Sequence, residues 1–301
     1  MLETIEGNAL LRASLAEALR AGRLAHSVLL CGARGTGTGY AARCLAADYL
    51  YPDGGDGARC VMEGASPELL VLEGEGASGD IKVERVREVR REVFATALSA
   101  EGRVVLIRGA DHLNASGANA LLKVLEEPPE GVLFILTAPS AASVLPTVRS
   151  RSCAYALAPV STAECAARLV KEGAQEQQAA EWAAVFGGKI GLGLRVLRDE
   201  TFAARYAAAR AAAAACEAKD AYGAMLALAP FERERAAALD VCECLAELCA
   251  AAMRGARAET GLSPERGAHA LPHVQKARAR IRGNAGGKLV FTVLGMNLGE
   301  A

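Results

Sequence analysis

Short apolar runs alternate with helical patterns over the first half of the chain. Apolar residues recur at helical spacing from Leu10 to Leu19, and the apolar run Ser27–Cys31 then stops at a glycine-rich stretch. Such a run, bounded by glycine, predicts a buried strand. Four later runs have the same character and are expected to be strands: 68–73, 103–107, 132–137 and 153–157. Strands that alternate with helices favour an α/β fold with a parallel sheet covered on both faces.

Helices are expected between these strands. The segment 40–51 has helical spacing, and the segment 83–98 places Val86, Val89, Val93 and Ala97 on one stripe. A further helix is predicted over 119–127, and the two prolines that follow it directly are expected to end it. The segment 52–57 is rich in glycine and aspartate, which favours a loop.

The pattern changes near residue 160. From Ser161 onward strand-like runs do not return, and the sequence is typical of helices, including an alanine-rich stretch at 207–215. We therefore expect three parts: an α/β domain over 1–160, a small helical lid over 161–200 and an all-α collar over 201–301.

Composition narrows the class of protein. Hydrophobic residues make up 52% and charged residues 23% of the 301 residues, which excludes a globally disordered chain. The net charge of -1 argues against binding nucleic acid through overall charge, although a local basic patch would still allow it. The N-terminal residues lack the basic and apolar regions of a signal peptide, and no apolar run reaches the ~20 residues that span a bilayer. Nine cysteines without a regular spacing suggest free thiols, so we expect a cytoplasmic protein with no membrane partner.

The glycine-rich stretch after the first strand has the context of a phosphate-binding P-loop. It supplies Gly32, Gly35 and Gly37, and a helix is expected to follow. A working P-loop also has a lysine that reaches the β/γ-phosphates and a Ser/Thr that holds Mg²⁺. Thr38 and Gly39 occupy those two positions. The stretch is therefore either a degenerate P-loop that still accepts an anion or a plain glycine-rich turn.

Four further segments indicate a family. The run from Asn119 to Pro129, NALLKVLEEPP, resembles the helix that follows the Walker B strand in bacterial DNA polymerase III clamp-loader subunits, which are AAA+ proteins. The segment Arg23-Leu24-Ala25-His26 is similar to the lead-in to their P-loop, and 81–87 resembles another of their segments. Ser150, Arg151 and Ser152 stand where the family has Ser-Arg-Cys. These matches cover about residues 20 to 160.

The resemblance implies that ATP chemistry is lost. Counting back from the shared helix, the Walker B acidic pair falls on Arg108 and Gly109. The segment 187–191 resembles the family's sensor-2 segment, with Gly191 at the usual arginine. An arginine cannot hold Mg²⁺ or activate water. Together with Thr38 and Gly39, these departures resemble the delta-prime type of subunit, so no intrinsic enzymatic activity and no cofactor are expected. A polymerase label would apply only through membership of the holoenzyme.

The resemblance also implies partners and a role for one residue. A delta-prime-type subunit assembles with delta and tau/gamma subunits, and the complex loads the sliding clamp on primed DNA. Arg151 lies at the family's trans arginine, which contacts the γ-phosphate held by a neighbouring subunit. Two alternatives remain at this point: an ATP-hydrolysing tau/gamma-type motor, and an AAA+ protein of DNA repair or regulation.

A metal site is not expected. Clamp-loader subunits often bind zinc through four cysteines before the second strand, and here that segment has only Cys60, with Cys44 upstream. Cys242, Cys244 and Cys249 are better explained as small buried side chains. His26 is interpreted as a packed residue, and His112 as a turn residue with DNA contact as the alternative.

Two features near the C-terminus are interpreted as structural. His269 and His273 are four residues apart, but Pro272 is expected to interrupt the helix between them, which argues against a metal pair. A basic cluster is interpreted as a solvated helix face, with contact to a partner or a phosphate as the alternative. Its members are Arg278, Arg280, Arg282 and Lys288.

Overall fold

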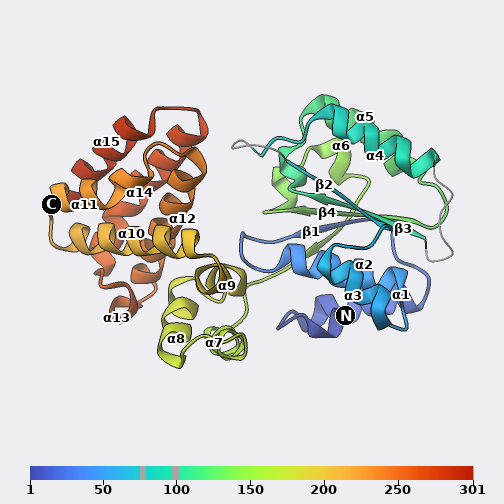
Figure 1. Cartoon of the computed structure of the whole chain (residues 1–301), viewed down its shortest axis with the longest axis horizontal. Coiled ribbons are helices and arrows are strands. Elements are labelled where there is room, and N and C mark those ends of the chain that lie inside the picture. Colours follow the sequence, from blue (N-terminus) through green and yellow to red (C-terminus); the bar gives the residue numbers. More distant parts are fainter. Residues whose placement is uncertain (75–78, 96–101, 301) are drawn as a thin grey trace. The chain divides into compact units, whose positions relative to one another are not determined.

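The computed structural model of the chain describes residues 1–74, 79–95 and 102–300. The chain divides into two compact units, Met1–Val160 and Ser161–Ala301. Figure 1 shows a sheet with helices on both faces in the first unit and a group of helices in the second. The division falls where the sequence changes from alternating strands and helices to helices alone.

Five parallel strands form the centre of the first unit, in the order β2-β3-β4-β1-β5. In β1, which lies between β4 and β5, Leu29 lies opposite Leu136 on one side and Ala154 on the other. The parallel α/β class predicted from the sequence is confirmed, and the strands fall on the five predicted runs. They are Ser27–Cys31 (β1), Leu69–Glu73 (β2), Arg103–Arg108 (β3), Val132–Ala138 (β4) and Cys153–Ala156 (β5).

Successive residues of β1 point to opposite faces of the sheet. Val28 and Leu30 join one buried cluster, which also contains residues of α1, α2 and α3. Leu29 joins a second cluster with residues of α4, α5 and α6 on the opposite face (Figure 1). The helices are Ala9–Arg20 (α1), Thr38–Leu50 (α2), Gly55–Glu63 (α3), Val83–Ala95 (α4), Ala115–Glu126 (α5) and Pro146–Arg149 (α6).

Two predictions for the first unit need correction. The segment 52–57, predicted as a loop, contains the start of α3, because Ala58 and Val61 are buried in the cluster that α2 shares and hold that segment as a helix. The helix predicted to begin at residue 119 begins at Ala115. Its N-cap is Asn114, whose side chain accepts a hydrogen bond of 2.8 Å from the backbone N–H of Gly117.

The stripe predicted for the helix at 83–98 is confirmed where the structure describes it. Val86, Val89 and Val93 of α4 are buried. Ala97 lies outside the described residues.

The described residues of the second unit form helices only. The first begins with a capping box in which Ser161 and Glu164 satisfy each other's backbone N–H groups. Helix α12 packs against α10 and α14, and α11 packs against α15. The helices are Thr162–Lys171 (α7), Glu176–Val185 (α8), Ile190–Arg198 (α9), Glu200–Glu217 (α10), Ala221–Leu228 (α11), Arg235–Met253 (α12), Arg257–Thr260 (α13), Pro264–Arg282 (α14) and Gly287–Gly299 (α15).

Buried ion pairs join the helices of the predicted lid to those of the predicted collar. The carboxylate of Asp240 in α12 is buried and accepts hydrogen bonds from Arg205 of α10 at 2.7 Å and Arg195 of α9 at 3.2 Å. Lys189, just before α9, pairs with Glu247 of α12. The boundary at residue 200 thus lies within one compact unit, and the separation of lid from collar stays a prediction. Among the described helices, none is long and apolar enough to cross a membrane.

Candidate functional site

The glycine-rich stretch connects β1 to α2, as a P-loop does. A side chain at Gly32 would place its Cβ only 2.5 Å from Oγ1 of Thr36 and 2.9 Å from the carbonyl oxygen of Leu157, so this close approach requires glycine. Gly35 and Gly37 have φ angles of 88° and 97°, which L-residues with a side chain rarely adopt. The sequence therefore specifies the shape of this loop tightly.

The side chains of the loop do not supply phosphate or metal chemistry. The Thr36 hydroxyl donates a hydrogen bond of 2.8 Å to the carbonyl oxygen of Ala33 within the loop. Thr38 and Gly39 begin α2, and neither offers an ammonium group or holds the hydroxyl expected at the Mg²⁺ position. The backbone has the form of a P-loop, and the two side-chain functions of a P-loop are missing.

The carboxyl end of β3 carries Arg108 and Gly109. Parallel pairing sets Arg108 opposite Glu73 of β2, and Nη1 of Arg108 lies 2.8 Å from Oε2 of Glu73. Gly109 has a φ of 75°, and its N–H donates to Oγ1 of Thr137 at 3.2 Å. The strand end that carries an acidic pair in a hydrolysing AAA+ subunit therefore holds an internal ion pair.

These two segments line one cavity of about 310 Å³. Glu73 supplies its single lining carboxylate among the described residues, and Arg108 already pairs with it. The residues present do not fit a Mg²⁺–nucleotide complex, which needs a lysine, a hydroxyl and acidic residues around the metal. The described lining residues are Thr38, Gly39, Glu73, Gly74, Gly79, Arg108, Gly109, His112 and Thr137.

Asp111 does not restore the acidic function. It lies in the short turn after β3, and its Oδ2 is 3.7 Å from Nε2 of His112. Its Oδ1 is buried and has no hydrogen-bond partner among the described residues. His112, and not Asp111, lines the cavity.

Arg151 follows the short helix α6 and is held by four contacts. Its Nε and Nη2 donate to Oε1 of Glu126, the last residue of α5, with the Nε contact at 2.7 Å. Its Nη1 donates to the carbonyl oxygen of Thr147 at 3.0 Å and to Oγ of Ser150 at 3.3 Å. The Arg151 side chain is about one-third exposed. Sequence reasoning found Arg151 but missed Glu126, because a contact between residues 25 positions apart leaves no local signal.

Ser152 fixes the position of Arg151 relative to the sheet. The Ser152 hydroxyl lies 2.9 Å from the hydroxyl of Ser27, the first residue of β1. The glycine-rich loop follows Cys31, the last residue of the same strand. Arg151 and the loop therefore lie at opposite ends of β1, about 13 Å of strand apart. The structure does not bring Arg151 into the cavity beside the loop.

All nine cysteines are free thiols. Cys60 is exposed in α3 and Cys44 is buried in α2. Cys242, Cys244 and Cys249 are all buried in α12, which confirms that they are core residues. Within the described ranges, no group of three or more His, Cys, Asp or Glu side chains is arranged to hold a metal ion.

The histidines differ in part from the predictions. His26 is packed as expected, with Nε2 at 2.8 Å from the carbonyl oxygen of Leu125. The expected interruption at Pro272 is wrong, because α14 continues through it from Pro264 to Arg282. His269 and His273 therefore lie on one helix face, with ring centroids 5.2 Å apart.

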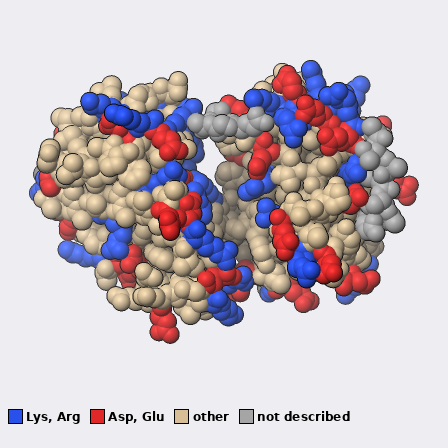
Figure 2. Space-filling model, in the orientation of Figure 1, with Lys and Arg blue, Asp and Glu red and all other residues tan. Residues whose placement is uncertain are grey.

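The basic cluster does not form one surface. Arg278 pairs with Glu243 of α12 at 3.7 Å, whereas Arg280 lines a cavity between α14 and α15. On the face shown in Figure 2, basic and acidic side chains are mixed on both units. This mixture agrees with the net charge of -1.

Comparison with known proteins identifies the family. The family model described as DNA polymerase III, delta subunit, matches residues 7–161 of the 301 residues, which is just over half of the chain. The chain belongs to this family. The expectation of a clamp-loader subunit, based on NALLKVLEEPP and Ser150-Arg151-Ser152, is confirmed.

Curated relatives carry the names of two kinds of subunit. DNA polymerase III subunit gamma/tau of Mycobacterium tuberculosis is 35% identical over 151 residues, covering 48% of this chain and 26% of the relative. Subunit delta' of Yersinia pestis is 39% identical over 107 residues, covering 36% and 32%. Subunit delta' of Bacillus subtilis is 29% identical over 157 residues, covering 50% and 47%. The chain thus matches between about a quarter and a half of the length of these relatives.

A solved structure supports the fold. The crystal structure of a DNA polymerase III gamma subunit-related protein from Thermotoga maritima superposes with a TM-score of 0.54 at 16% identity, covering 95% of this chain and 99% of that one. At this identity the likeness concerns the fold alone. The fold is of the AAA+ class, with a parallel α/β unit followed by helices.

Proposed function

We propose that this chain is an ATPase-inactive, delta-prime-type subunit of a DNA polymerase III clamp loader. One observation carries the proposal: the cavity between the loop after β1 and the end of β3 is lined by Thr38, Gly39, Arg108 and Gly109. A hydrolysing subunit needs a lysine, a Ser/Thr hydroxyl and acidic residues at such a place. The Arg108–Glu73 ion pair supports the same conclusion, since the carboxylate that remains is already neutralised.

In the proposed complex the chain acts as a partner and not as a motor. It assembles with delta and tau/gamma subunits, and the complex places the sliding clamp on primed DNA. Arg151 contacts the γ-phosphate bound by the adjacent subunit. The position of Arg151 supports this role, because it lies at the end of β1 opposite to the chain's own loop. A guanidinium is always charged and can donate two parallel hydrogen bonds to phosphate oxygens.

Two alternative functions account for fewer of the observations on this chain. The gamma/tau relative, at 35% identity, is the observation that favours an ATP-hydrolysing motor. That role would require the chain to position Mg²⁺ and water without the residues that do so in other P-loop proteins. An AAA+ protein of DNA repair or regulation would not account for the family match over residues 7–161.

Two measurements on the purified chain test the proposal. Mixed with the delta and tau/gamma subunits of its own organism, the chain should co-elute with them in size-exclusion chromatography at the mass of one complex. Alone, it should hydrolyse ATP no faster than a buffer blank containing Mg²⁺. Metal-dependent turnover by the isolated chain that is lost in Gly37→Val would contradict the inactive role, because Gly37 lies in the loop that would hold the phosphates.

A further inference from the structure

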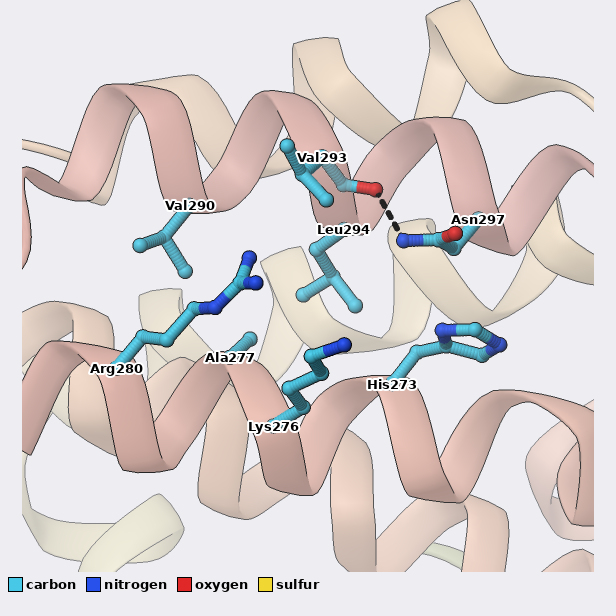
Figure 3. A pocket seen from close by; sticks show the side chains of 8 residues that line it. All are labelled: His273, Lys276, Ala277, Arg280, Val290, Val293, Leu294 and Asn297. Carbon is cyan, nitrogen blue, oxygen red and sulfur yellow. Dashed lines mark hydrogen bonds between the residues drawn. The ribbon is translucent and has the colours of Figure 1, made fainter.

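A groove runs between α14 and α15 in the second unit. It encloses a volume of about 180 Å³ (Figure 3). Basic and polar side chains of α14 form one wall, and mainly apolar side chains of α15 form the other. The residues lining it are His273, Lys276, Ala277, Arg280, Val290, Val293, Leu294 and Asn297.

Cationic side chains face the groove without a counter-charge. Lys276 and Arg280 are four residues apart and therefore share one face of α14. Figure 3 shows both side chains extending from α14 toward α15. In the part of the chain that the structure describes, neither forms an ion pair, whereas Arg278 of the same helix pairs with Glu243 at 3.7 Å. The groove therefore concentrates positive charge that the fold itself does not neutralise.

The opposite wall offers apolar contact. Val290, Val293 and Leu294 line the groove. The next positions around α15 continue the apolar surface to the outside, because Leu289 is 70% and Met296 is 53% exposed. Asn297 donates from its side chain to the carbonyl oxygen of Val293 at 2.7 Å, which fixes its amide at one end of the groove (Figure 3).

We propose that this groove binds an acidic segment of a protein partner, with carboxylates against Lys276 and Arg280 and apolar side chains against α15. Charge complementarity selects an acidic occupant, and the exposed apolar positions select one with its own hydrophobic side chains. A single-stranded nucleic acid fits less well, since none of the described lining residues is a Phe, Tyr or Trp on which a base could stack. This site is separate from the proposed ATPase-inactive role, because it uses neither the glycine-rich loop nor Arg151.

Fluorescence anisotropy on the full chain tests the groove. The probe is a labelled helical peptide with glutamate on one face and leucine on the adjoining face, and a second peptide has glutamine in place of glutamate. The unmutated chain should bind the acidic peptide more tightly than the neutral one. The double variant Lys276→Glu/Arg280→Glu should weaken binding of the acidic peptide by about tenfold or more. The matched control is Lys171→Glu/Arg233→Glu, which makes the same charge change at exposed positions outside the groove.

The binding measurements distinguish an acidic protein segment from a nucleic acid as the ligand of the groove. Equal affinity of the unmutated chain and the double variant for the acidic peptide would overturn the proposal, and so would no binding by the unmutated chain. A labelled single-stranded oligonucleotide that binds, and that the double variant no longer binds, would assign the groove to nucleic acid instead. Lys276→Gln/Arg280→Gln removes the charges without reversing them, so a graded loss across the two double variants would support direct pairing. Thermal melts of each variant establish that the fold is kept.

Discussion

Arg151 and Glu126 hold together two segments that carry the family resemblance. Both Nε and Nη2 of the guanidinium donate to Oε1 of Glu126. Glu126 belongs to the NALLKVLEEPP helix, and Arg151 to the Ser150-Arg151-Ser152 turn. A phosphate of a neighbouring subunit would accept hydrogen bonds from the same Nε and Nη2 of Arg151. We infer that Glu126 keeps Arg151 oriented until such a phosphate replaces it.

The first prediction concerns the stability of this pair. The Arg151 and Glu126 side chains are 32% and 46% exposed, so solvent screens their attraction. Glu126→Gln should therefore lower the free energy of unfolding by less than about 1 kcal/mol. Urea denaturation followed by circular dichroism measures this, with the neighbouring exposed Glu127→Gln as control. A loss of several kcal/mol would mean that the pair supports the fold and not the presentation of Arg151.

The second prediction concerns acid stability of the second unit. Glu217, at the end of α10, accepts hydrogen bonds from the backbone N–H of Ser263 at 2.9 Å and from its hydroxyl at 2.8 Å. These bonds favour the carboxylate and lower the pKa of Glu217. Because the pKa is lowered in the folded state, the stabilisation is present at a pH above the pKa of the unfolded chain, which is about 4.3. It is lost as the pH falls through the pKa of the folded chain.

Glu217→Gln should accordingly lower the free energy of unfolding at pH 7 by about 1 kcal/mol. At a pH below both pKa values, the difference between the variant and the unmutated chain should disappear. Urea titrations across this pH range measure it. A difference that is constant with pH would show that the carboxylate charge is not involved.

The third prediction concerns the thiols. Burial raises the pKa of Cys242 and Cys249 to about 12 and that of Cys165 to about 11. The thiolate is the reactive form, so these buried thiols should resist modification at neutral pH. Of the nine cysteines, the two exposed ones, Cys60 and Cys153, should react fast with a disulfide reagent in the native chain. Cys60→Ser should remove one fast equivalent, and all nine should react after unfolding. Fast reaction of Cys242 in the native chain would contradict its burial.

The fourth prediction concerns zinc. A structural zinc site takes four ligands, and the segment in which relatives of this kind would supply them contains only Cys60, which is exposed. Elemental analysis of the purified chain should therefore give much less than one zinc per molecule. One zinc per chain that is lost in Cys60→Ser would show that other residues complete a site there.

The strands could be predicted from the sequence because each is a short apolar run that ends at a change of pattern. The run Ser27–Cys31 is buried at every position, as an interior strand of a covered parallel sheet requires. Helix α3 was missed because its first turn contains Gly55 and Gly57, and burial of Ala58 and Val61 outweighs that local preference. The continuation of α14 through Pro272 was missed for the same reason: packing against α12 and α15 overrides a local break.

For the candidate site, the sequence predicts which residues occupy the single positions but not which distant residues they contact. The glycines of the loop and the departures at Thr38, Gly39 and Arg108 are visible in the sequence. The partner of Arg108 is not, because Glu73 is brought opposite it by the register of β2 against β3. The unpaired cations of the α14–α15 groove could not be predicted from the sequence either. Arg278 and Arg280 are both basic residues of one helix, but in the described structure only Arg278 forms an ion pair.

DNA-stimulated ATP hydrolysis by the assembled loader that contains Arg151→Ala tests whether Arg151 acts in trans. The matched control is Arg149→Ala, two residues away, whose guanidinium makes only a 3.5 Å contact with the carbonyl oxygen of Ala141 in the described part of the chain. Arginine residues that act in trans contribute roughly 10³–10⁵ in rate at single sites of other enzymes. We expect the Arg151→Ala complex to assemble normally and to lose the hydrolysis that depends on the adjacent site, while Arg149→Ala keeps it. An Arg151→Ala complex that hydrolyses ATP and loads clamps at the unmutated rate would show that Arg151 does not act in trans.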